Sequence, residues 1–304
     1  MVSEMPGWLY IGLISIESLL CFYVLYVAFM VCILYPEYVF KKVPMTCFYI
    51  FAILGISVNV CFIWYGTNLF SVETKTVLIL YLSAVFCHIA LQHCLLMNLC
   101  EFYLQVKVLT QGNFLTQSVL SDFKQSLIGN ETEVGYRQKQ NKIIVTLILI
   151  CLLMIDLALY GTALYFLIKS PDTPDQEFKI VQMVMAGITN ANLIAYFIMT
   201  VILKKFFKDQ FNGRFNSKMK PIILVCYLLF LQFIVEIVNL TITILYEDPN
   251  DTLMKLLLQI QETVMPYISL LIPCLIIFRQ HLQVFAKKDN RDRNQPIDTS
   301  VILV

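Results

Sequence analysis

Residues 143–168 read IIVTLILICLLMIDLALYGTALYFLI, and a stretch of this kind decides the fold class. Its single charged residue is Asp156, and the rest is apolar, aromatic, small or hydroxyl-bearing. About 20 predominantly apolar residues are enough for an α-helix to cross the hydrocarbon core of a bilayer. The stretch therefore predicts a transmembrane helix.

The composition of the whole chain supports the same class. Of the 304 residues, 59% are hydrophobic and only 14% are charged, whereas a soluble domain carries about 25% charged residues. Most of the surface must therefore face hydrocarbon, which excludes the soluble fold classes. The net charge of +1 argues against nucleic acid or an acidic substrate as an electrostatic partner.

Segments long enough to span a bilayer recur along the chain, and each is bounded by a polar or proline-containing stretch. Seven are expected, at about residues 8–34, 45–65, 77–106, 143–168, 180–203, 221–246 and 256–278. The fold class is therefore an all-α membrane protein, a seven-transmembrane helix bundle over residues 1–285 with a cytoplasmic tail over 286–304. The first segment lacks the basic n-region of a signal peptide and is too long for one. The longest connection is the third inner loop, about 109–142.

The basic residues orient the bundle, because Lys and Arg are retained on the cytoplasmic side. With the N-terminus outside and the C-terminus in the cytoplasm, only Lys75, Lys169, Lys179 and Lys255 of the 22 Lys and Arg residues face outward. The sequon at Asn250 then lies in an outer loop, where glycosylation is expected, or it matches by chance.

Signatures of catalysis and of metal binding are missing. The ten cysteines fall inside apolar runs, where a thiol behaves as a small hydrophobe, and no C-x-x-C pair occurs. His88 and His93 are five residues apart, which rotates them by about 140° on a helix, so they cannot bind one ion together. We expect no enzyme activity, no cofactor and no metal site.

Polar residues inside the segments form the candidate ligand site. Ionisable groups are costly in hydrocarbon and tend to face the bundle interior or a water-filled cavity. Six polar residues, on five segments, are expected to line a pocket in the outer half of the bundle: Glu17, His88, Asn190, Glu236, Asn239 and Glu262. The alternative is that they make interhelical hydrogen bonds that fix the packing.

The last segment contains the elements of a switch. Pro266 and Pro273 lie seven residues apart, and each proline frees a backbone carbonyl and permits a kink. At the inner end of the third segment, Glu101 is expected either to snorkel to the interface or to pair with a cation after the fifth segment. Those cations are Lys204, Lys205, Lys208 and Arg214. Residues 281–285 are expected to form an amphipathic helix on the inner membrane surface.

The seven segments, the outer N-terminus and the basic inner loops resemble a G-protein-coupled receptor. The sequences around Glu101 (Cys100-Glu101-Phe102-Tyr103) and from Glu262 to Pro273 resemble the nematode serpentine chemoreceptors, nearest the Sra/Sre-type superfamily. Phe102 stands where that superfamily tends to carry Arg. The N-P-x-x-Y motif and the outer-end Cys of the rhodopsin-like class are absent.

The resemblance implies a chemosensory receptor in the plasma membrane. The membrane of a sensory cilium is included in this expectation. Such a receptor binds a small organic ligand, signals through its inner loops and has a heterotrimeric G protein as a cytoplasmic partner. The alternative function is a seven-helix transporter or membrane scaffold, in which the intramembrane acids serve transport or packing. Against a transporter with inverted repeats, no corresponding pair of Gly/Pro-interrupted segments occurs.

Overall fold

The computed structural model describes residues 7–66, 74–117, 127–169, 176–211, 216–245 and 270–294. Within these ranges the structure is helical and contains no strand, which confirms the all-α prediction for the described part. The helices are α1 (Gly7–Leu34), α2 (Pro36–Val39), α3 (Val43–Gly66), α4 (Thr74–Gln117), α5 (Leu127–Lys169), α6 (Gln176–Phe211), α7 (Asn216–Leu245) and α9 (Ile272–Asn294).

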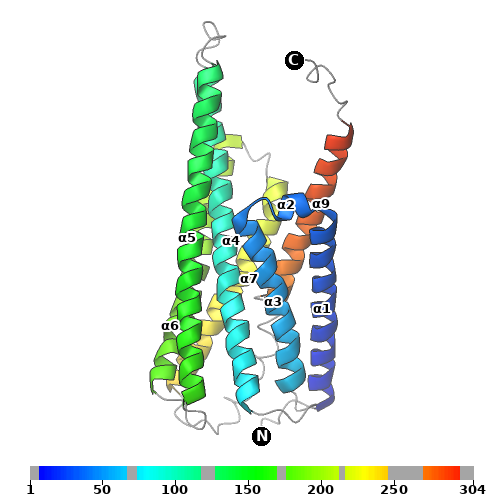
Figure 1. Ribbon diagram of the computed structural model, residues 1–304, viewed down its shortest axis with the longest axis vertical. Coiled ribbons are helices and arrows are strands. Elements are labelled where there is room, and N and C mark those ends of the chain that lie inside the picture. The colour runs from blue at the N-terminus through cyan, green and yellow to red at the C-terminus, as the bar shows by residue number, and fades with distance from the viewer. Residues whose placement is uncertain are drawn as a thin grey trace.

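The long helices lie roughly side by side, and successive ones run in opposite directions (Figure 1). The longest, α4, contacts α3, α5 and α6. On the other side of the bundle, α1 contacts α3 and α9, and α7 contacts α6 and α9. The last described helix therefore packs between the first helix and α7.

Within the described residues, five helices are long and apolar enough to cross a membrane. These candidate spans are Ile14–Leu34, Val43–Ile63, Ile79–Gln105, Lys139–Lys169 and Met183–Phe206. They coincide with the first five predicted segments. The predicted sixth and seventh segments contain shorter apolar helices, Lys220–Val235 and Ile272–Ala286, and residues 246–269 lie outside the described part.

The distribution of apolar side chains is that of a protein surrounded by lipid. Large apolar residues are exposed on the outer faces of the spans, for example Leu19 at 70%, Leu147 at 57% and Met183 at 64%. Tyr49 and Phe278 are buried between the helices. Exposing so much apolar surface to water is unfavourable by about 25 cal/mol per Å², so these faces fit a hydrocarbon environment.

One close helix contact depends on a glycine. A Cβ atom added to Gly55 on α3 would lie 3.1 Å from the Cβ atom of Cys87 on α4. That distance is tighter than ordinary van der Waals contact, so the absence of a side chain lets α3 and α4 approach closely. Small residues at membrane helix interfaces commonly have this effect.

The end of the bundle that carries α2 is called the α2 end below. Several exposed basic residues lie on the parts of the helices toward this end. The chain direction in Figure 1 brings the C-terminal ends of α4 and α6 to this end, together with the N-terminal ends of α5 and α7. Lys107, Lys139, Lys204 and Lys220 lie on these helix ends and are exposed. These four described lysines therefore lie toward the α2 end, whereas Lys169, at the C-terminal end of α5, lies toward the other end.

Two predicted boundaries differ from the structure. Much of the expected loop at 109–142 is helical, because α4 continues to Gln117 and α5 begins at Leu127. The expected surface helix at 281–285 is part of α9, which continues without a break to Asn294. All three helices, α4, α5 and α9, extend beyond their apolar parts, whereas hydropathy marks only where a membrane span ends.

Candidate functional site

His88 lies near the middle of the α4 span and joins α4 to α7. Its Nε2 atom is 2.9 Å from the amide nitrogen of Gln92, one helical turn along α4, and 3.1 Å from the amide nitrogen of Gln232 on α7. A neutral imidazole nitrogen has either one proton or one lone pair. The two amides therefore compete for one ring nitrogen, and this contact alone does not saturate their hydrogen-bonding capacity.

The second buried contact joins α4 to α5. The Nδ1 atom of His93 is 2.7 Å from the Oδ2 atom of Asp156, and both side chains are almost completely buried. His88 and His93 thus have partners on different helices, α7 and α5. Among the described residues, no group of three or more His, Cys, Asp or Glu side chains is arranged to hold a metal ion.

Glu17 has a separate partner on α3. The amide nitrogen of Asn59 donates a hydrogen bond to the Glu17 carboxylate over 3.0 Å, and both side chains are buried. Removing a carboxylate from water is unfavourable unless it is hydrogen-bonded, and Asn59 meets that need here. Glu17 and His88 therefore have distinct partners, on α3 and α7.

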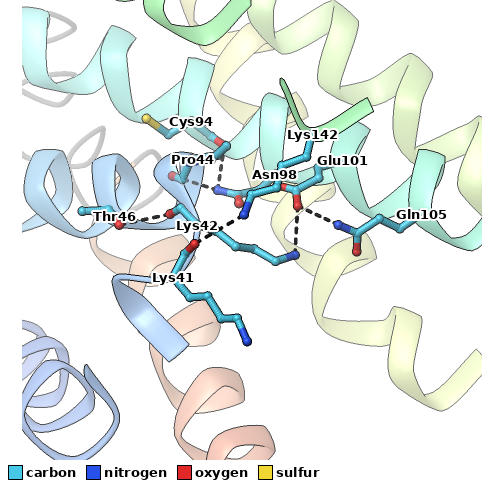
Figure 2. Close-up of polar contacts among 9 residues, drawn as sticks. All are labelled: Lys41, Lys42, Pro44, Thr46, Cys94, Asn98, Glu101, Gln105 and Lys142. Atoms are coloured by element: carbon cyan, nitrogen blue, oxygen red, sulfur yellow. Dashed lines mark hydrogen bonds and ion pairs between the residues drawn. The ribbon is translucent and has the colours of Figure 1, made fainter. Parts of the chain in front are cut away.

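Glu101 is buried near the α2 end and pairs with Lys42, in the connection between α2 and α3 (Figure 2). The Lys42 Nζ atom lies 3.0 Å from Glu101 Oε1, and the Gln105 amide donates to the same oxygen over 2.7 Å. The sequence left two alternatives, a carboxylate that snorkels to the interface or a partner after the fifth segment, and the structure instead buries Glu101 and pairs it with Lys42. The reason is that α3 packs against α4 and brings its own N-terminal end to Glu101.

The start of α3 and the connection before it contact two more helices, α4 and α5. The Asn98 amide donates to the carbonyl of Pro44 over 3.2 Å, and Lys142 of α5 donates to the carbonyl of Lys41 over 3.5 Å. The Thr46 hydroxyl donates to the carbonyl of Lys42 over 3.0 Å. Figure 2 shows these contacts around the same connection. The position of Lys42 is thus fixed by contacts with α4 and α5.

An aromatic group ties α9 to the same connection. The Phe285 ring stacks on Tyr38 and His281, with centroid distances of 5.1 and 5.3 Å. The Nδ1 atom of His281 is 3.0 Å from the hydroxyl oxygen of Tyr49 on α3. Movement of α9 would therefore disturb the segment that carries Lys42.

Pro273, one of the two predicted kink prolines, is buried in the first turn of α9. It follows directly on a π-helical turn at Leu270 and Leu271. A proline lacks the backbone donor of a regular helix, and π turns mark interruptions of the helical hydrogen-bond ladder. The kink at Pro266 and Pro273 stays a prediction, because residues 246–269 lie outside the described part.

Several buried polar atoms have no hydrogen-bond partner among the described residues. They are the Gln92 Oε1, Asp156 Oδ1, Asn190 Oδ1 and Asn192 Nδ2 atoms. Such atoms are uncommon in native structures, and each requires a physical explanation. Three of the four are acceptors.

The predicted ligand set is therefore only partly described. Glu17, His88 and Asn190 are described. The side chains of Glu236 and Asn239 on α7, together with Glu262, Pro266 and Asn250, lie outside the described residues.

Sequence reasoning missed four partners: Gln92, Gln232, Asn59 and Lys42. Only Gln92 had a local signal, because it lies four residues after His88 and so shares its helix face. The other three lie on different helices, and nothing in the sequence pairs them with their partners.

No family model matches the sequence, and neither the curated proteins nor the solved structures include a match.

Proposed function

We propose that the protein is a seven-helix membrane receptor of the chemosensory type, which binds a small organic ligand inside the bundle and signals at its α2 end. The sixth span would be α7, and the seventh would combine residues 256–269 with the start of α9. Seven spans are supported by the alternating helix directions in Figure 1 and by the apolar character of Lys220–Val235 and Ile272–Ala286.

The proposed orientation places the α2 end in the cytoplasm and the N-terminus outside. The support is the basic side chains at this end, such as Lys107, Lys139 and Lys204, because such residues are retained on the cytoplasmic side. The Asn250 sequon then lies outside, as in a glycoprotein of the plasma membrane or of a sensory cilium. A heterotrimeric G protein is the proposed partner at the α2 end.

The observation that carries the proposal is the contact of His88 with Gln92 and Gln232 in the middle of the bundle. It joins two helices through neutral polar groups, at a depth where ordinary packing uses apolar side chains. A ligand there would bias the relative position of α4 and α7. The same α4 carries Glu101 and its ion pair at the α2 end, so a shift of α4 would be felt there.

A two-part experiment tests the proposal in cells. An epitope tag at residue 1 should label on intact cells, and a tag at residue 304 only after permeabilisation. A screen for ligand-dependent signalling should then yield an agonist. Alanine substitution of the predicted site (Glu17, His88, Asn190, Glu236, Asn239 and Glu262) should abolish the response and leave surface expression intact. The opposite labelling pattern contradicts the orientation, and an unchanged response of the alanine variant contradicts the site.

A transporter or scaffold is the second candidate, and one observation favours the scaffold. Glu17 and Asp156 already have partners, Asn59 and His93, on neighbouring helices. Such contacts serve packing without any ligand. A scaffold would show neither ligand-dependent signalling nor solute flux after reconstitution into liposomes, and a transporter would show flux alone.

A further inference from the structure

Arg279 is an exposed cation on the surface that α1 and α9 share. Its guanidinium donates a hydrogen bond to the Tyr23 hydroxyl and lies 5.6 Å from the centroid of the Tyr23 ring. Arg279 is exposed, and Tyr23 is 41% exposed. Because α1 and α9 lie in contact (Figure 1), the pair sits at the outer edge of their contact.

The guanidinium lies well inside the span of α1. Tyr23 is close to the middle of the Ile14–Leu34 span. The Phe285 ring contacts Tyr35, just beyond the end of α1, and this contact marks a common level at the α2 end. At about 1.5 Å per residue, Arg279 is about 9 Å from Phe285 along α9, whereas Tyr23 is about 18 Å from Tyr35 along the first helix. The Arg279 side chain therefore points away from the α2 end and does not reach toward the water there.

An exposed guanidinium at this depth is unusual. Charged side chains are costly in hydrocarbon, and those within membrane spans almost always face the bundle interior, where they pair with one another or with backbone carbonyls. Arg279 instead faces outward, although it directly follows the seventh predicted segment, 256–278. A charge that faces outward in the membrane is stabilised if an acidic group meets it from outside the bundle.

The neighbouring face of α1 has the spacing of a helix-packing seam. Its exposed residues recur alternately three and four positions apart, and they are Leu19, Phe22, Tyr26, Phe29 and Ile33. This is the a/d spacing with which one helix packs along another. Tyr23 follows Phe22 directly, so the Arg279–Tyr23 pair flanks the seam. The face thus combines a long apolar contact surface with one cation beside its centre.

We propose that this face of α1 and α9 binds a transmembrane helix of another protein that carries an Asp or Glu side chain near the middle of its span. Arg279 pairs with that carboxylate, and the seam packs along the partner helix. A second copy of the chain fits less well, because a symmetric contact through this face brings two arginines together. An anionic lipid headgroup also fits less well, because headgroups lie at the edges of a hydrocarbon core about 30 Å thick. This assembly surface is independent of the proposed ligand site.

A designed helix provides the first test. The full chain, labelled with an acceptor dye at its C-terminus, is reconstituted in phosphatidylcholine vesicles with a donor-labelled peptide of about 20 leucines and alanines. The peptide has one central Glu, and a matched peptide has Gln in its place. Energy transfer should show that the Glu peptide binds about tenfold more tightly. Arg279→Gln should abolish this preference, whereas the control Lys204→Gln, which removes an exposed lysine of α6, should retain it.

A second variant separates the seam from the charge. Tyr26→Ala removes an exposed ring and should weaken the binding of both peptides by about the same factor. Its preference for Glu over Gln should remain about tenfold, because Arg279 is unchanged. Equal binding of the two peptides to the parent, or a preference that survives Arg279→Gln, overturns the proposal. So does an unchanged affinity of Tyr26→Ala for both peptides.

The same vesicles distinguish the other occupants. Energy transfer between labelled copies of the chain that is lost in Arg279→Gln assigns the face to a dimer and overturns the proposal. Loss of the Glu preference when part of the phosphatidylcholine is replaced by phosphatidylglycerol assigns Arg279 to anionic lipid, with the same consequence.

Thermal unfolding in nanodiscs separates a binding role from a structural one. The melting temperature of Arg279→Gln should be equal to that of the parent or higher, because the variant no longer exposes a charge to hydrocarbon. If Arg279→Gln melts below the Lys204→Gln control, its loss of binding reflects a contact that holds α1 against α9, and the proposal is overturned.

Discussion

Removing the charge of Lys42 should destabilise the protein more than removing the charge of Glu101. The two side chains form one ion pair, but Lys42 is 38% exposed and Glu101 only 3%. In Glu101→Gln the freed ammonium group can turn to water. In Lys42→Gln the carboxylate stays buried, with Gln105 as its remaining described donor.

The exposures set the expected magnitudes. A partly solvated ion pair contributes at most about 1 kcal/mol, so Glu101→Gln should lower the free energy of unfolding by about that much. An uncompensated buried charge destabilises by about 3–5 kcal/mol, and the lower limit applies to Lys42→Gln because the site borders on solvent. The double variant should be more stable than Lys42→Gln alone, because no unpaired carboxylate remains.

Thermal unfolding of the full chain in nanodiscs measures these differences. At about 2–4 °C for each kcal/mol, Lys42→Gln should melt roughly 6–12 °C below the parent, and Glu101→Gln about 2–4 °C below. Lys41→Gln is the matched control, because the exposed Lys41 contributes only its backbone carbonyl to the described contacts. The melting temperature of Lys41→Gln should equal that of the parent. The reasoning would be refuted if Lys42→Gln had the same melting temperature as this control. It would also be refuted if the double variant had a melting temperature no higher than that of Lys42→Gln.

Three further predictions concern the other contacts. His93→Leu should lower the melting temperature more than Asp156→Asn, because only His93→Leu leaves a buried carboxylate unpaired. The same unfolding assay compares the two variants. A lower melting temperature for Asp156→Asn would contradict this reasoning. Pro273→Ala should reduce the agonist response without loss of ligand binding, measured by paired dose–response and binding curves, and unchanged efficacy excludes this proline from the switch. Asn250→Gln should increase electrophoretic mobility through loss of a glycan, and identical mobility of parent and variant means that Asn250 carries none.

The spans are predictable from sequence because the length of an apolar run is a local property. Residues 143–168 predicted a helix that the structure extends at its N-terminal end to Leu127. The polar residues 127–142 gave no signal for this extension, since a helix that leaves the membrane has no reason to stay apolar. The same limitation applies to α9, where the apolar part ends at Ala286 and the helix at Asn294.

The partners of the polar residues were decided by the tertiary structure. The sequence identified Glu17, His88, His93, Glu101 and Asp156 as groups that need shielding, because each is polar within an apolar run. The spacing of the two histidines predicted only that they cannot bind one ion together. The choice of Lys42 over Lys204, Lys205 and Lys208, which lie near the C-terminal end of α6, depended on which helix ends meet at the α2 end. That arrangement follows from packing along whole helices, including the close approach at Gly55, and a single helix does not encode it.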